Sequence, residues 1–208
     1  MNITIIGYGN MGSALARLLG RSGHHITLTG RDLDKAKEVA SHSGGKVSPL
    51  HEAAKDVDII IAATPFTSQI ESLKSLGNLF GKIVIEISNP LKPDMSGLQI
   101  GLTTSAAEEV SRLFPDSKVV KAFNTTFAQV LQEGPVFKTG KAQVFYAGDD
   151  EAAKSKVKLL IESLGFEAMD AGPLANSRYL EPMGMLNIWF GYMAQKGTGI
   201  APAWISRV

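Results

Sequence analysis

The first residues of this sequence that could do chemistry are three glycines at fixed spacing, Gly7, Gly9 and Gly12. They form the pattern G-x-G-x-x-G directly after an apolar run and directly before an amphipathic helical pattern. Such a strand–turn–helix unit offers bare backbone amides to a pyrophosphate, and the glycines allow the phosphates to approach. A glycine-rich turn without a ligand is the alternative interpretation. The predicted dinucleotide site also includes Tyr8, Asn10 and Met11.

The end of the second apolar run indicates which dinucleotide is bound. Sequences that bind NAD usually carry an acidic residue about 20 positions beyond the glycines, where it holds the ribose 2′-hydroxyl. Here Arg31 offers a guanidinium fork to a 2′-phosphate, Thr29 offers a hydroxyl and Lys35 an ammonium group. The pattern therefore favours NADP. Asp32 and Asp34 keep NAD open, although Asp32 also suits the N-cap of the following helix.

Three further segments place small polar groups beside a proline or an aromatic ring, each directly after an apolar run. In an open parallel sheet, ligands bind beyond the carboxyl ends of the strands, so these segments are candidates for the nicotinamide end of the site. Ordinary turn and cap chemistry is the alternative interpretation. The candidates are Thr64, Pro65 and Phe66, then Ser88 and Asn89, and finally Asn124.

The sequence offers little acid–base machinery. All four histidines, His24, His25, His42 and His51, lie in the first quarter of the chain, and none follows a predicted strand. There is no cysteine, nucleophile elbow, phosphate-binding loop of the P-loop type or metal-ligand spacing. We therefore assign no catalytic side chain and no metal ligand. Hydride transfer between two ring cofactors needs alignment and water exclusion more than a proton donor, so it fits this composition better than carbonyl reduction.

The overall composition is that of a globular protein. The chain has 208 residues, of which 44% are hydrophobic and 20% charged, and its formal net charge is +1. No basic field is present to attract nucleic acid. The N-terminus lacks a signal-peptide pattern, and the apolar stretch 183–193 is shorter than the roughly 20 residues of a membrane span. We expect a cytoplasmic protein with no membrane partner and a small-molecule or flavin-type electron acceptor.

Alternation of apolar β-branched runs with helical patterns predicts a Rossmann-type, doubly wound, mostly parallel α/β sheet. We expect one NADP-binding domain over residues 1–208, with residues 173–208 a C-terminal helical extension. Pro182 with Gly184 should start or kink the final helix, which could wall the acceptor site, cover the core or form a homodimer interface. The expected strands are Ile3–Ile6, His25–Thr29, Val57–Ala62, Lys82–Ile87, Lys118–Ala122, Ala142–Ala147 and Phe166–Asp170.

The glycine motif, the run V-V-K-A-F-N-T at 119–125 and the run D-A-G-P-L-A-N-S-R at 170–178 resemble the deazaflavin-dependent NADP oxidoreductases over nearly the whole chain. The middle run also resembles the NADPH-binding domain of the STEAP metalloreductases. The resemblance implies a Rossmann-type fold, bound NADP and a tricyclic acceptor near the nicotinamide. The deazaflavin enzymes carry histidine where this chain has Asn124, so the acceptor is either a flavin or a deazaflavin.

The sequence thus predicts an NADPH-dependent reductase that transfers hydride to a flavin or deazaflavin-type ring. Two alternatives remain. The chain could bind NADP(H) without turnover, as a redox sensor or an interaction module, because a bound dinucleotide does not prove catalysis. It could also be an imine or carbonyl reductase.

Overall fold

The computed structural model describes residues 1–207, which are built around one eight-stranded sheet. The strands of this sheet are β1 (Asn2–Ile6), β2 (His25–Thr29), β3 (Lys46–Val47), β4 (Ile59–Ala62), β5 (Ile83–Glu86), β6 (Lys118–Ala122), β9 (Gln143–Gly148) and β10 (Glu167–Asp170). They lie in the order β10-β9-β6-β5-β4-β1-β2-β3. All seven predicted strands are present, with ends within two residues of those expected. The two-residue strand β3 and the small hairpin of β7 (Val136–Phe137) and β8 (Gly140–Lys141) were not predicted.

Six neighbouring strands, from β3 to β6, run parallel, which confirms the doubly wound, mostly parallel class. The chain then reverses, because β9 pairs antiparallel with β6 and β10 pairs parallel with β9. The sequence pattern did not indicate this reversal. A parallel neighbour needs a crossover that returns the chain to the starting end of the sheet. The only helix between β6 and β9, α5 (Ala128–Glu133), has 6 residues and spans about 9 Å, too short to do so.

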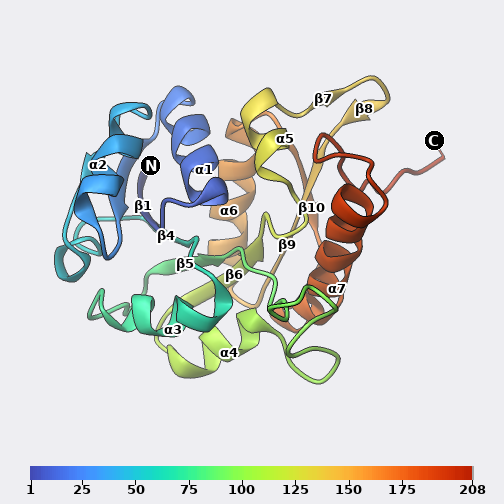
Figure 1. Cartoon of the computed structure of the whole chain (residues 1–208). Helices are drawn as coiled ribbons and strands as arrows, with labels where there is room; N and C mark the ends of the chain where they lie inside the picture. Colours follow the sequence, from blue (N-terminus) through green and yellow to red (C-terminus); the bar gives the residue numbers. More distant parts are fainter. Residues whose placement is uncertain (208) are drawn as a thin grey trace.

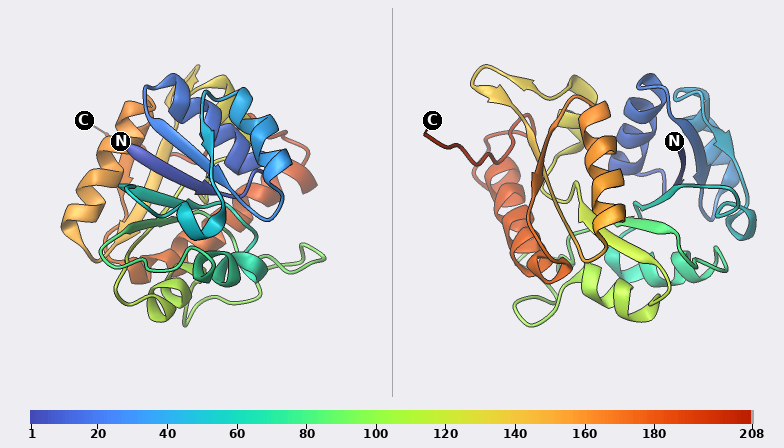
Figure 2. Two further views of the ribbon diagram at one scale, coloured as in Figure 1. Left: turned by 90° about the vertical axis from the view of Figure 1, so that its left-hand side faces the viewer. Right: turned by 180° about the vertical axis from the view of Figure 1, so that it is seen from behind.

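Helices cover both faces of the sheet. Figure 1 shows α1 (Asn10–Arg21), α5 and α6 (Glu151–Ser163) on one face, and α3 (Phe66–Lys74) and α4 (Ala106–Leu113) on the other. The helix α2 (Leu33–Ser41) packs against β2 and β3 at one end of the sheet. At the other end, α7 (Ser177–Ile188) lies beside the β9 and β10 strands, as the rear view in Figure 2 shows.

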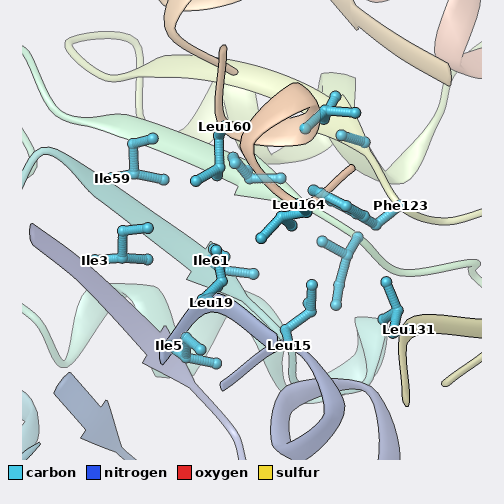
Figure 3. Close-up of a cluster of buried hydrophobic side chains, with 14 of the residues drawn as sticks. Ile3, Ile5, Leu15, Leu19, Ile59, Ile61, Phe123, Leu131, Leu160 and Leu164 are labelled. Atoms are coloured by element: carbon cyan, nitrogen blue, oxygen red, sulfur yellow. The ribbon is translucent and has the colours of Figure 1, made fainter. Parts of the chain in front are cut away.

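The main hydrophobic core lies between the sheet and the α1, α5 and α6 layer. Ile3 and Ile61 from the strands meet Leu15 from α1 and Leu160 from α6 there (Figure 3). Burying such a side chain contributes about 1.5–3 kcal/mol, so this cluster fixes the strand ends that form the site. Because a second core packs on the opposite face, a strand such as β4 is buried throughout and shows no alternation of apolar and polar residues.

Of the two roles expected of Pro182 with Gly184 in the final helix, that of starting it is wrong. α7 begins at Ser177, so Pro182 lies inside the helix and does not start it. Leu180 packs against Phe145 and Ala147 of β9, and a π-helical turn, Trp189–Met193, follows the helix. Within residues 1–207, no helix is both long enough and apolar enough to cross a membrane.

Candidate functional site

A cleft of about 750 Å³ opens where β1, β4, β5 and β6 end. These four strands are neighbours in the parallel part of the sheet, so the segments that follow them converge at one edge. The structure brings nine of the fifteen predicted site residues together in the wall of this cleft. They are Gly9, Asn10, Met11, Thr64, Pro65, Phe66, Ser88, Asn89 and Asn124.

The glycine turn at one end of the cleft is shaped by close backbone contacts. Gly7 has a φ of +100°, and a Cβ atom there would lie 2.7 Å from the carbonyl oxygen of Ala63. A Cβ on Gly12 would lie 2.1 Å from the carbonyl oxygen of Gly7, so helix and turn can approach only because that position is glycine. Beside Gly9 there is open space, because beyond its own chain neighbours no protein atom lies within 4 Å of an added Cβ. This leaves room for a ligand to approach the backbone.

Helix N-termini supply positive potential to the cleft. α1, α3 and α5 each begin at the cleft, and none has a side chain bonded to its first amides. By contrast, α2, α4 and α6 begin away from these lining segments and are capped by Asp32, Ser105 and Asp150. The free amides of a helix N-terminus bind anionic oxygens, and α1 follows the glycine turn directly. The α1 terminus therefore fits the pyrophosphate of a dinucleotide.

The remaining predicted residues lie outside the cleft lining, in the glycine turn and at the corner between β2 and α2. Asp32 accepts hydrogen bonds from the backbone amides of Asp34 and Lys35, which confirms its predicted role as an N-cap. The Tyr8 hydroxyl accepts a hydrogen bond of 2.9 Å from the amide of Asp32 and so fixes this corner. Arg31 is exposed, whereas the Lys35 ammonium lies 3.7 Å from the Asp32 carboxylate. Arg31 is therefore the better placed cation for an added phosphate.

Several hydroxyl groups near the cleft have no hydrogen-bond partner within the described chain. Thr125 and Thr126 are nine-tenths or more buried, and the hydroxyls of Thr64 and Ser88 are also enclosed and unpartnered. All four residues line the cleft. Leaving a buried hydroxyl unpaired costs about 1–3 kcal/mol, so such groups need an explanation. No contact within the described chain explains these four hydroxyls.

The turn after β6 places Asn124, Thr125 and Thr126 in the wall of the cleft. Phe123 is fully buried and has a φ of +61°, a conformation that a bulky side chain rarely adopts. Such backbone strain clusters at functional sites, and here it reverses the chain at the strand end. The Asn124 side chain donates 2.9 Å to the Oδ1 atom of Asn89 and 2.7 Å to the carbonyl oxygen of Leu180. Its own Oδ1 atom is buried and has no hydrogen-bond partner within residues 1–207.

A fully buried cluster of charges lies behind Ser88. Lys121 from β6 forms ion pairs with Glu86 from β5 and, at 2.8 Å, with Glu181 from α7. Burial raises the pKa of the Glu181 carboxyl above its usual value, and repulsion from Glu86 adds to the shift while Lys121 opposes it. The sequence reasoning missed this cluster. A lysine and a glutamate inside apolar strand patterns were the available indication, because such residues are almost never buried unless paired.

The far wall of the cleft comes from the C-terminal region, as one of the sequence interpretations expected. Gly184, Asn187 and Ile188 of α7 line it together with Tyr192 and Met193 of the π-helical turn. Sequence reasoning named this region without selecting these residues. Among the described residues that line the cleft, none is Asp, Glu, His, Lys or Arg. The wall is apolar and aromatic, with amides and hydroxyls as its polar groups.

The fold and this cleft define a Rossmann-type dinucleotide-binding protein. Comparison with known proteins gives the family. Residues 2–90 match the family described as NADP oxidoreductase, coenzyme F420-dependent. The F420-dependent NADP reductase of Methanocaldococcus jannaschii is 31% identical over 221 residues, which cover 96% of this chain and 97% of that protein. The chain therefore belongs to the family of F420-dependent NADP oxidoreductases, which confirms the predicted resemblance.

Two further comparisons agree with this assignment. The solved structure of a candidate F420-dependent NADP reductase from Arthrobacter sp. FB24 is 30% identical, covers 100% of both chains and has a TM-score of 0.87. Metalloreductase STEAP3 of Rattus norvegicus is 33% identical over 190 residues, which are 90% of this chain but 37% of that protein. The chain thus spans a little over a third of the length of this metalloreductase.

Proposed function

We propose that the cleft binds NADP(H) beside a flavin or deazaflavin-type ring and that the protein catalyses hydride transfer between the two. The observation that carries this proposal is the division of the cleft into two chemically different ends. One end has the open glycine turn and the free amides of α1. The other has an aromatic and apolar wall with unpaired hydroxyls. The first suits a pyrophosphate and the second suits stacked rings.

The residues present fit a dinucleotide by their own geometry. Open space beside Gly9 gives the phosphates access, and Arg31 at the β2–α2 corner presents a fork to the 2′-phosphate. The unpaired hydroxyls of Thr64 and Thr125 and the free oxygen of Asn124 provide partners for polar edges of the nicotinamide and acceptor rings. When bound, NADPH supplies a hydride, which reduces the acceptor ring by two electrons and leaves NADP⁺.

The chain itself orients the two rings and excludes water from between them. Phe66, Phe127 and Ile188 supply apolar surface to the cleft, and alignment of two bound reactants can account for several kcal/mol of a reaction barrier. Reduction of a carbonyl would also need a proton donor for the developing alkoxide. Tyr192, which is 58% exposed, is the one described lining residue with a proton to donate from a titratable group. Transfer to a ring acceptor that takes its proton from solvent suits this lining better.

The experiment is a spectrophotometric assay of NADPH oxidation with riboflavin, FMN, FAD, coenzyme F420, a cyclic imine and a ketone as separate acceptors. Turnover with one of the flavin or deazaflavin compounds supports the proposal. Turnover with only the imine or the ketone would replace it with the reductase alternative. Tight NADPH binding without oxidation by any acceptor would favour the redox sensor.

We also propose that the protein forms a homodimer through the outer face of α7. Tyr179, Leu186 and Trp189 are 73%, 54% and 47% exposed, and between positions 179 and 195 the single charged residue is the buried Glu181. Large uncharged patches of this kind mark interaction surfaces. Sedimentation analysis of the wild-type protein and of Trp189→Glu tests this. A monomeric wild type at micromolar concentration would end the homodimer proposal.

A further inference from the structure

In the buried charge cluster, the Lys121 ammonium donates hydrogen bonds to three acceptors. It donates to Oε2 of Glu86, to Oε1 of Glu181 at 2.8 Å and to the carbonyl oxygen of Ser88 at 2.5 Å. An ammonium has three protons, so its capacity is fully used. The side chains of the three charged residues have no solvent-exposed surface.

Both backbone groups of Ser88 are consequently hydrogen-bonded to buried charged side chains. Its carbonyl oxygen accepts from Lys121, and its backbone amide donates 2.8 Å to Oε1 of Glu86. The same Glu86 oxygen also accepts 2.9 Å from the amide group of Gln69 on α3. The backbone at Ser88, which lies in the wall of the cleft, is therefore held by charge-assisted hydrogen bonds and not by a regular strand ladder.

The third charge connects this loop to α7. Oε2 of Glu181 accepts from the amide of Ala106 at 3.1 Å and Oε1 accepts from that of Ala107 at 3.4 Å, so the carboxylate also satisfies the start of α4. The preceding residue, Leu180, accepts the hydrogen bond from Asn124 through its carbonyl oxygen. One turn of α7 therefore holds both the loop after β5 and the loop after β6.

The energetics of the cluster favour a positional role over simple stabilisation. Two carboxyl groups face one ammonium, and further hydrogen bonds to their oxygens come from the N-terminus of α4 and from the amides of Gln69 and Ser88. Apolar side chains of similar volume commonly stabilise a fold as well as buried ion pairs do. What apolar side chains cannot do is orient a backbone carbonyl and amide such as those of Ser88.

We propose that Glu181 is a positioning residue that sets the geometry of the ring-binding end of the cleft through Lys121 and Ser88. This inference rests on the proposed function for its consequence, because the loop positioned is the one expected to contact the nicotinamide and acceptor rings. Glu181 itself does not line the cleft. Its effect passes through the three groups that the Lys121 ammonium joins.

Glu181→Gln is the sharpest test, because the carboxylate uses both oxygens as acceptors. A carboxamide has one acceptor oxygen, so glutamine must turn an NH₂ group towards either Lys121 or the amide of Ala106. Hydrogen exchange of the ligand-free protein measures the result, because local opening sets the exchange rate. We expect the amide of Ser88 to exchange about tenfold or more faster, as the loss of a charged hydrogen bond implies.

Arg178→Met is the matched control. Arg178 also joins α7 to α4, through a bidentate pair with Glu108 at 2.6–3.1 Å, but it does not touch Lys121 or Ser88. If the cluster only fastens α7, both variants will alter exchange at the start of α4 and α7 and leave Ser88 unchanged. Equal exchange at Ser88 in wild type and Glu181→Gln would overturn the proposal.

Should Glu181→Gln fail to give folded protein, Glu181→Asp carries the same test. It keeps the negative charge, but its shorter side chain draws the carboxylate away from the Lys121 ammonium, while Glu86 and its contact with the Ser88 amide stay in place. Faster exchange at the Ser88 amide is again expected. Exchange at Ser88 equal to that of the wild type would refute the positioning role.

Kinetics then separate this inference from the proposed function. In Glu181→Gln, the KM for the ring acceptor should rise about tenfold, whereas the Kd for adenosine 2′,5′-bisphosphate, which occupies only the phosphate end, should stay the same. If the wild-type protein fails to oxidise NADPH with every acceptor tested, the proposed function is wrong. The exchange result at Ser88 would still decide the role of Glu181. A uniform loss of both affinities would indicate general unfolding and overturn the inference.

Discussion

Thr125→Val should separate a ligand contact from a structural contact. The hydroxyl of Thr125 is enclosed, its residue is 1% exposed, and it has no hydrogen-bond partner among residues 1–207. Valine places a methyl group where the hydroxyl was and keeps the β-branched shape. No hydrogen bond within the described chain is lost. The substitution should therefore leave the free energy of unfolding unchanged or raise it by up to about 1–3 kcal/mol, the cost of a buried unsatisfied hydroxyl.

The affinity of the variant for its ligands should fall. If a bound ring or amide normally pairs with this hydroxyl, its removal costs about 0.5–1.5 kcal/mol, or about 2- to 13-fold in Kd or KM. The assay combines urea unfolding of the ligand-free protein with a fluorescence titration of NADPH and a KM measurement for the acceptor. A stable variant with weaker binding is therefore the expected result.

Thr4→Val is the matched control. Thr4 is also fully buried, but its hydroxyl donates 2.5 Å to the carbonyl oxygen of Ala53. Valine there should lower the free energy of unfolding by about 1–3 kcal/mol and leave the affinity for NADPH unchanged. If Thr125→Val destabilises the protein as Thr4→Val does, or binds both ligands as the wild type does, the reasoning from unpaired hydroxyls is refuted.

Three further predictions concern other parts of the molecule. Arg31→Ala should weaken NADPH binding about tenfold or more and leave NADH binding nearly unchanged, because the charged hydrogen bond to the 2′-phosphate is lost. Gly184→Ala would place a Cβ atom 2.5 Å from Oδ1 of Asn89, so it should lower the melting temperature and raise the KM for the acceptor. Although burial opposes it, hydrogen bonding to Arg178 lowers the pKa of the Glu108 carboxyl, so this contribution to stability is complete above the ordinary pKa of 4.5 and is lost as the pH falls through the lowered value. In Arg178→Met, urea midpoints should therefore depend less on pH in the acid range.

The first two of these predictions have a control variant, and each prediction has an outcome that would contradict it. Lys37→Ala is the control for Arg31→Ala, because it also removes one positive charge. Lys37 lies on α2 and is paired with Asp34 at 2.8 Å, so NADPH should bind to this variant as to the wild type. Equal weakening of NADPH and NADH in Arg31→Ala would defeat the assignment of the 2′-phosphate. Gly97→Ala adds a methyl group in open space and should melt as the wild type does. An acid stability profile in Arg178→Met that matches the wild type would remove the ion pair from the account of pH dependence.

Local patterns made much of the fold predictable. The buried strands, the glycine turn and the Asp32 cap depend on short-range chemistry, such as β-branched runs, positive φ at Gly7 and a carboxylate at a helix start. The direction of β9 was not accessible in the same way. It follows from the shortness of α5, and the pattern of apolar residues in a strand does not encode the direction in which that strand runs.

The candidate site shows the same division. Asn10, Thr64 and Asn124 could be selected because each follows a strand, and the fold then places all such segments at one edge. The Glu181 carboxylate could not be matched to Lys121, because the two residues are 60 positions apart and meet only through the packing of α7. Asn187 lines the cleft for the same reason. Contacts that depend on how one helix docks on a sheet are not written in local spacing.

The cleft has polarity without a charged side chain among the described residues that line it. Its positive potential comes from the helix termini of α1, α3 and α5, whose partial charges do not depend on pH. The charged side chains of Glu86, Lys121 and Glu181 are buried behind the wall and bonded to one another and to the start of α4. A hydride carries two electrons and no separate proton, so a site that only orients rings gains nothing from a nearby acid. If hydride transfer occurs here, its rate under single-turnover conditions should therefore vary little across the neutral pH range, whereas a site that relied on a titrating side chain would show a bell-shaped or sigmoidal profile.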